Sequence, residues 1–152
     1  MRVFLGILLV CLSTLISYVL TNKFSLKRQF YDDFYNFNTT LKQEISFRQT
    51  TLISLLKNGG TTDFYLLLTE FIENNKANQN IKYLSNDEIE SFYNYAKTLG
   101  AGDKDSQIEF LNEIGKSLLD KQKKCTQDEK NYKVLYIKLG FLLGLILFVL
   151  VL

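Results

Sequence analysis

The chain has 152 residues, and its 18 basic and 16 acidic side chains leave a net charge of only +2, which does not indicate nucleic-acid binding. Histidine is absent and only two cysteines occur, so the usual general base, the commonest zinc ligand and a disulfide framework are all missing. Proline is also absent, which permits long uninterrupted helices.

The N-terminal run from Val3 to Leu20 contains no charged residue. As a helix it would span ~27 Å, close to the hydrocarbon thickness of a bilayer. A cleaved signal peptide would need small residues at a cleavage site, and none suitable follows this run. No small residue precedes Cys11 to make a lipidation site, so Cys11 is interpreted as a small hydrophobe. We therefore expect an uncleaved membrane anchor over residues 1–22.

A helical domain is predicted for residues 23–133. Apolar residues recur at three- and four-residue steps from Leu26 to Leu55, which predicts an amphipathic helix ending at the Asn58-Gly59-Gly60 stop. A second helix is expected from Thr62 to about Asn74, with Thr61 or Thr62 as its cap, before a polar loop over residues 76–80.

The third predicted helix begins at Ser85, because Ser85 and Glu88 have the spacing of a capping box, and it ends at Gly100. Gly100 and Gly102 form the turn that follows, and Asp103 or Asp105 caps a fourth helix. This last helix has apolar residues at seven-residue spacing, which predicts packing along a neighbouring helix: Ile108, Leu111, Leu118, Cys125, Tyr132 and Leu139. The predicted fold class is all-α, an antiparallel helical bundle on two transmembrane helices.

Residues 134–152 are predicted to be a second, C-terminal transmembrane anchor of about 28 Å. Gly140 and Gly144 lie four residues apart and so share one side of a helix, where they would let another helix approach closely. Small residues of the first anchor, Gly6 among them, offer a matching stripe. A second copy of the chain or another membrane protein is the alternative partner for the two glycines.

Basic residues flank both apolar runs on their inner sides, which predicts a cytoplasmic middle segment with both termini outside. The lysines before the second anchor would contact acidic lipid or an acidic partner, or form a solvated face: Lys121, Lys123, Lys124, Lys130 and Lys133. The chain has no phosphate-binding loop, and its paired aspartates are interpreted as solvent-facing or capping residues. We therefore expect a protein that is not an enzyme and holds no cofactor or metal.

The C-terminal residues resemble the stage III sporulation protein AB family. The similarity lies in Leu99-Gly100, Asp103 and Gln107, in Lys121, Lys123 and Lys124, and in a terminal anchor with Leu139-Gly140 and Gly144-Leu145. Glu44-Ile45-Ser46-Phe47 also resembles an E-I-x-[YF] segment of that family. The chain departs from the family at Thr50-Thr51-Leu52, where the family has T-P-L, and residues 57–85 give no clear alignment.

The resemblance implies a membrane-embedded platform or adaptor of the channel between mother cell and forespore, similar in fold to the F-like platform domains of type II secretion systems. It implies a location in the mother-cell membrane around the forespore. The implied partners are other sporulation channel proteins, the cytoplasmic ATPase stage III sporulation protein AA, or a second copy of the chain. A generic two-anchor signalling or lipid-contacting module is the alternative function.

Overall fold

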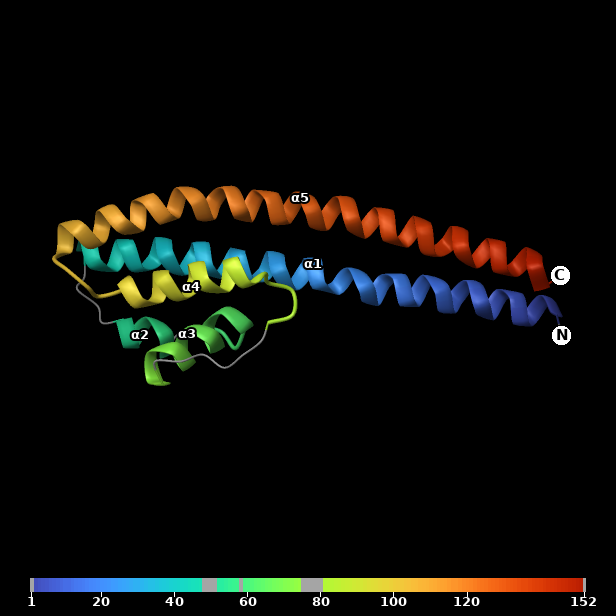
Figure 1. The fold of residues 1–152 in the computed structure, drawn as a ribbon, viewed down its shortest axis with the longest axis horizontal. Coiled ribbons are helices and arrows are strands. Elements are labelled where there is room, and N and C mark those ends of the chain that lie inside the picture. The colour runs from blue at the N-terminus through green and yellow to red at the C-terminus, as the bar shows by residue number, and fades with distance from the viewer. Residues whose placement is uncertain (1, 48–51, 58, 75–80, 152) are drawn as a thin grey trace. The chain divides into compact units, whose positions relative to one another are not determined.

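The computed structural model describes residues 2–47, 52–57, 59–74 and 81–151, and within these ranges every regular element is an α-helix (Figure 1). The helices are α1 (Arg2–Phe47), α2 (Leu52–Lys57), α3 (Asp63–Asn74), α4 (Asn86–Thr98) and α5 (Lys104–Val151). The prediction of an all-α fold is therefore confirmed.

The contacts of the chain group into two compact units. One, here called the hairpin unit, consists of Met1–Arg28 and Lys124–Leu152, and the other, the helical domain, consists of Gln29–Lys123. Within each unit the segments of α1 and α5 run antiparallel (Figure 1). The predicted anchors, residues 1–22 and 134–152, are bounded by hydropathy rather than by contacts, and these boundaries stay a prediction.

The core of the helical domain is a cluster of phenylalanine rings from three helices. The ring of Phe64 in α3 has its centroid 5.7 Å from that of Phe30 and 5.2 Å from that of Phe34, both in α1. Phe92 of α4 lies 5.9 Å from Phe64 in an edge-on arrangement. None of these four rings is more than 5% exposed. Edge-on and offset pairs are favoured by the ring quadrupole, so the cluster gains specific geometry as well as burial.

Local capping signals fix the start of α4 as predicted. The Ser85 hydroxyl accepts a hydrogen bond from the Glu88 backbone N–H, and the Glu88 carboxylate accepts one from the Ser85 N–H at 2.9 Å. The start of α3 differs from the prediction at Thr62. Its hydroxyl is buried and has no hydrogen-bond partner among the described residues, so only its carbonyl, which accepts from Leu66, takes part in the helix.

Two described helices cover most of the predicted amphipathic helix from Leu26 to Leu55. Helix α1 extends to Phe47, and α2 begins at Leu52. Residues 48–51 lie outside the described residues, so the continuity of the predicted helix stays a prediction. The predicted polar loop over residues 76–80 lies outside the described residues.

The predicted seven-residue stripe of α5 is buried only in its first part. Leu111, Leu118 and Cys125 are 8% exposed or less, whereas Tyr132 and Leu139 are 41% and 48% exposed. A straight α-helix turns by ~20° per heptad relative to a strict seven-residue repeat, so four heptads move a side chain far from the starting face. In the hairpin unit Tyr132 still stacks on Phe24 of α1, whereas beyond it Gly140, next to Leu139, is the residue that faces α1.

Helices α1 and α5 each contain a stretch that is long and apolar enough to cross a membrane. Only 6% of this stretch in α1 and 11% in α5 is buried, whereas the core helix of a soluble protein would be mostly buried. Large apolar side chains such as Phe4 and Val149 are more than 70% exposed. The two ends of the chain lie at the same end of the hairpin unit (Figure 1). These features indicate membrane association.

Replacement of Phe64 by Ala should destabilise the helical domain by about 3–5 kcal/mol, because it removes a fully buried ring and leaves a cavity. Thermal unfolding of the full chain in detergent, followed by circular dichroism, measures the effect. Phe47→Ala is the matched control, since Phe47 is 86% exposed and its loss should leave the melting temperature nearly unchanged. Equal melting temperatures for the two variants would contradict the placement of the core.

Candidate functional site

The turn between α4 and α5 is held by one buried glutamine. Gly100 and Gly102 have positive φ angles of 79° and 93°, which favour glycine. The amide oxygen of Gln107 accepts the Gly100 N–H at 3.2 Å, while its amide nitrogen donates to the carbonyls of Thr98, at 3.1 Å, and of Ala101. A side chain in the first turns of α5 thus satisfies carbonyls that the end of α4 leaves without helical partners.

Asp103, one of the two predicted caps, immediately precedes α5. Its carbonyl accepts the Gln107 N–H at 3.0 Å. Its side chain accepts a hydrogen bond from the Ser106 hydroxyl, and this bond, followed by backbone hydrogen bonds, lowers the pKa of the carboxyl below its usual value. A lowered folded-state pKa stabilises the fold above the unfolded-state pKa, and this contribution is lost as the pH falls through the folded-state pKa.

Replacement of Gln107 by Leu keeps the volume of the side chain and removes all three hydrogen bonds of its amide. We expect a loss of about 2 kcal/mol, because backbone polar groups of the turn are left without this partner. The melting temperature of the full chain should then fall by roughly 4–10 °C. Gln43→Leu, at an exposed position of α1, is the matched control and should shift it little. An unchanged melting temperature for the Gln107→Leu variant would show that Gln107 does not stabilise the turn.

The two glycines of the second anchor face α1 within the hairpin unit. A Cβ added at Gly140 would collide with the side chain of Ser17 and lie 3.1 Å from the carbonyl oxygen of Ser13. A Cβ at Gly144 would lie 2.8 Å from the Cα of Val10. Distances this short to backbone atoms cannot be relieved by rotating a side chain, so both positions need glycine for this helix approach.

Gly6 also lies in a close contact, but its neighbour is the ring of Phe148 rather than Gly144. The three glycines predicted to pack in the membrane, Gly6, Gly140 and Gly144, therefore all lie between α1 and α5 of one chain. Ser13, which faces Gly144, donates its hydroxyl hydrogen to the carbonyl of Val10 in its own helix at 2.9 Å. Its polar group is thus satisfied without a second protein.

Replacement of Gly144 by Leu keeps the anchor apolar and should destabilise the chain by about 1–3 kcal/mol, because the added side chain collides with the backbone at Val10. The measurement is the melting temperature of the full chain in detergent, followed by circular dichroism. Val149→Leu is the control, because Val149 is 71% exposed and its enlargement should leave the melting temperature nearly unchanged. Equal melting temperatures for the two variants would refute the glycine contact.

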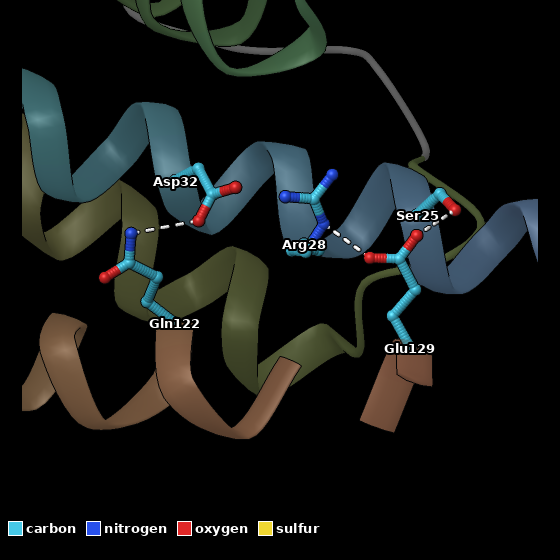
Figure 2. A network of polar contacts seen from close by, with 5 residues as sticks. All are labelled: Ser25, Arg28, Asp32, Gln122 and Glu129. Atoms are coloured by element: carbon cyan, nitrogen blue, oxygen red, sulfur yellow. Dashed lines mark hydrogen bonds and ion pairs between the residues drawn. The ribbon is translucent and has the colours of Figure 1, made fainter. Parts of the chain in front are cut away.

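Polar side chains also join α1 and α5 in the hairpin unit, next to its basic residues. Glu129 of α5 accepts a hydrogen bond from the Ser25 hydroxyl at 2.6 Å and pairs with the Arg28 guanidinium at 2.5 Å (Figure 2). The Ser25 bond and, after it, the charge of Arg28 lower the pKa of the Glu129 carboxyl against the effect of burial. The ring of Phe24 stacks on that of Tyr132 with centroids 4.8 Å apart. The sequence analysis did not predict these pairs.

The five lysines predicted to contact lipid or a partner are divided between the two units. Lys121 and Lys123 belong to the helical domain, where the ammonium of Lys121 lies 5.6 Å from the ring centroid of Tyr31. The same domain holds a hydrogen bond from Gln122 to Asp32 at 2.9 Å (Figure 2). Lys124, Lys130 and Lys133 belong to the hairpin unit. Lys133 lies over Tyr18, whereas Lys124 and Lys130 are exposed.

The fold and these contacts define an all-α, membrane-associated protein built on two long apolar helices. The family model of stage III sporulation protein AB (spore_III_AB) matches residues 54–152, about two thirds of the chain. The chain therefore belongs to the stage III sporulation protein AB family and has a sporulation-related role. Comparison with curated proteins gave no match, and comparison with solved structures gave none either.

The matched region contains the turn glycines, Gln107, the lysines and the glycines of the second anchor. It also extends through residues 57–85, where the sequence analysis found no clear alignment with the family. Residues 44–47, which resembled a family segment, lie before the match begins. The family is thus supported by the C-terminal two thirds of the chain.

Proposed function

We propose that this chain is a membrane-embedded platform or adaptor of the channel that links mother cell and forespore. The observation that carries the proposal is the family match, which begins at residue 54 and extends over the rest of the helical domain and the second anchor together. A helical domain carried on two apolar helices suits a protein that holds other components at a membrane. The adaptor acts by contact rather than by catalysis and needs no cofactor.

In this proposal the two anchors, residues 1–22 and 134–152, lie in the mother-cell membrane, and the helical domain faces the mother-cell cytoplasm. Basic residues next to both apolar stretches support this orientation, since positively charged segments remain on the cytoplasmic side. The domain would then meet cytoplasmic partners, with the ATPase stage III sporulation protein AA and other channel proteins as the candidates. The exposed Lys124 and Lys130 favour, as a second function, contact with anionic lipid headgroups.

Alkaline phosphatase inserted after Asn80 should have little activity in cells, whereas the same enzyme fused to the C-terminus should be active, because the phosphatase matures only outside the cytoplasm. The measurement is phosphatase activity normalised to the amount of fusion protein. High activity from the insertion after Asn80 would reverse the proposed orientation.

Deletion of the gene tests the function itself, and heat-resistant spore counts are the measurement. A platform of the channel should be required for spore formation, whereas a lipid-contacting module acting elsewhere should not. Normal spore counts after deletion would refute the channel function and leave the second function.

A further inference from the structure

A groove of about 250 Å³ opens on the helical domain between its α1 and α5 segments. One wall comes from α1 and includes Asn38 and Lys42, and the other comes from α5 and includes Leu111, Gly115 and Lys116. Two of the residues that line it are lysines and none is acidic. The volume suits one or two side chains of a protein segment and is small for a nucleotide.

A buried amide closes the inner part of the groove. Asn38 is 2% exposed, and its amide nitrogen donates to the Leu111 carbonyl at 2.9 Å. Its amide oxygen is buried as well, so a ligand in the groove does not reach this acceptor. Recognition of a ligand therefore depends on the rim of the groove.

Gly115 keeps the groove open beside this amide. A Cβ at this position would lie 3.1 Å from the Asn38 amide nitrogen, closer than ordinary packing allows. A larger side chain at residue 115 would both press on Asn38 and fill the space next to it. Glycine in the interior of a helix costs about 1 kcal/mol relative to alanine, so the open space is kept against helix propensity.

The rim of the groove is positively charged. The Lys42 ammonium donates to the side-chain oxygen of Asn112 at 2.8 Å, and an ammonium has three donors, so it can bind a further acceptor. Lys116, on the other wall, is exposed. A ligand that fits the rim therefore carries a carboxylate.

We propose that this groove is the docking site for an acidic segment of a partner protein, with a carboxylate bound between Lys42 and Lys116. Charge complementarity selects the acidic segment, and the groove volume limits what enters to one or two side chains. The proposal rests on the adaptor function proposed above and assigns to it a surface for binding a partner.

The test uses the full chain in nanodiscs of zwitterionic lipid and a fluorescein-labelled decapeptide composed of Ser, Leu and Glu. The peptide's twin has Gln in place of every Glu. Fluorescence anisotropy should give at least tenfold tighter binding of the acidic peptide than of its twin. Equal affinity of the two peptides would overturn the proposal, and so would complete displacement of the acidic peptide by millimolar inorganic phosphate, which would identify a site for small anions.

Two variants tie the binding to the groove. Lys116→Glu reverses one rim charge at an exposed position, and Gly115→Leu fills the groove without a change in charge. Each should weaken binding of the acidic peptide at least tenfold. Lys97→Glu makes the same charge change at an exposed position of α4 and should alter the affinity less than twofold. If Lys116→Glu and Lys97→Glu reduce the affinity equally, the peptide responds only to the net charge of the protein. This result would also overturn the proposal.

Spore counts separate failure of the groove from failure of the adaptor function. Lys116→Glu should reduce spore formation at least tenfold while the protein reaches normal levels in the membrane, and Lys97→Glu should not. If deletion abolishes spores but Lys116→Glu neither binds the peptide less well nor sporulates less well, the groove assignment is wrong and the adaptor function stands. Normal sporulation after deletion would refute the adaptor function itself.

Discussion

The packing of Phe64 is the interaction on which the helical domain depends. Phe64 is fully buried and contacts rings from α1 and α4, so one side chain of α3 joins helices that are far apart in the sequence. The helix α3 itself has only 12 residues, and helices of this length are marginal in water without tertiary packing. Burial of the aromatic cluster therefore supplies the stability that local propensity does not, and the loops and the groove of the domain depend on it.

The hairpin unit cannot rely on the same driving force, because lipid is as apolar as the side chains it would replace. Its helices are held instead by close backbone approach at Gly140 and Gly144 and by the contacts of Glu129 with Ser25 and Arg28. The two glycines face α1 of the same chain, and large leucine and isoleucine side chains of the unit are exposed.

Features with a local signal could be predicted from the sequence, and features made by distant residues could not. The capping box of Ser85 and Glu88 spans four residues and was found directly. The Asn38–Leu111 and Ser25–Glu129 bonds join residues 73 and 104 positions apart, and nothing near either partner indicates the other. The seven-residue stripe holds as far as Tyr132, which stacks on Phe24, but Leu139 is 48% exposed and the adjacent Gly140 faces α1. A straight helix drifts from a strict seven-residue repeat, so the stripe does not hold over its full length. Gln107 was marked only by family resemblance, because a buried amide that fastens a turn has no periodic signature.

In both units, glycines of α5 make room for polar side chains of α1. Each of three glycines of α5 lies beside a polar residue of α1: Gly115 beside Asn38, Gly140 beside Ser17 and Gly144 beside Ser13. What differs is where the polar group finds its partner. Ser13 bonds within its own helix, as a hydroxyl surrounded by hydrocarbon must do if no water is present, whereas Asn38 reaches across to the carbonyl of Leu111 and keeps an unused acceptor. In the hairpin unit the polar group of Ser13 is already satisfied, so this contact serves packing alone. In the helical domain the amide of Asn38 links α1 to α5 directly, so the polar residue there holds two helices together as well as filling the space beside a glycine.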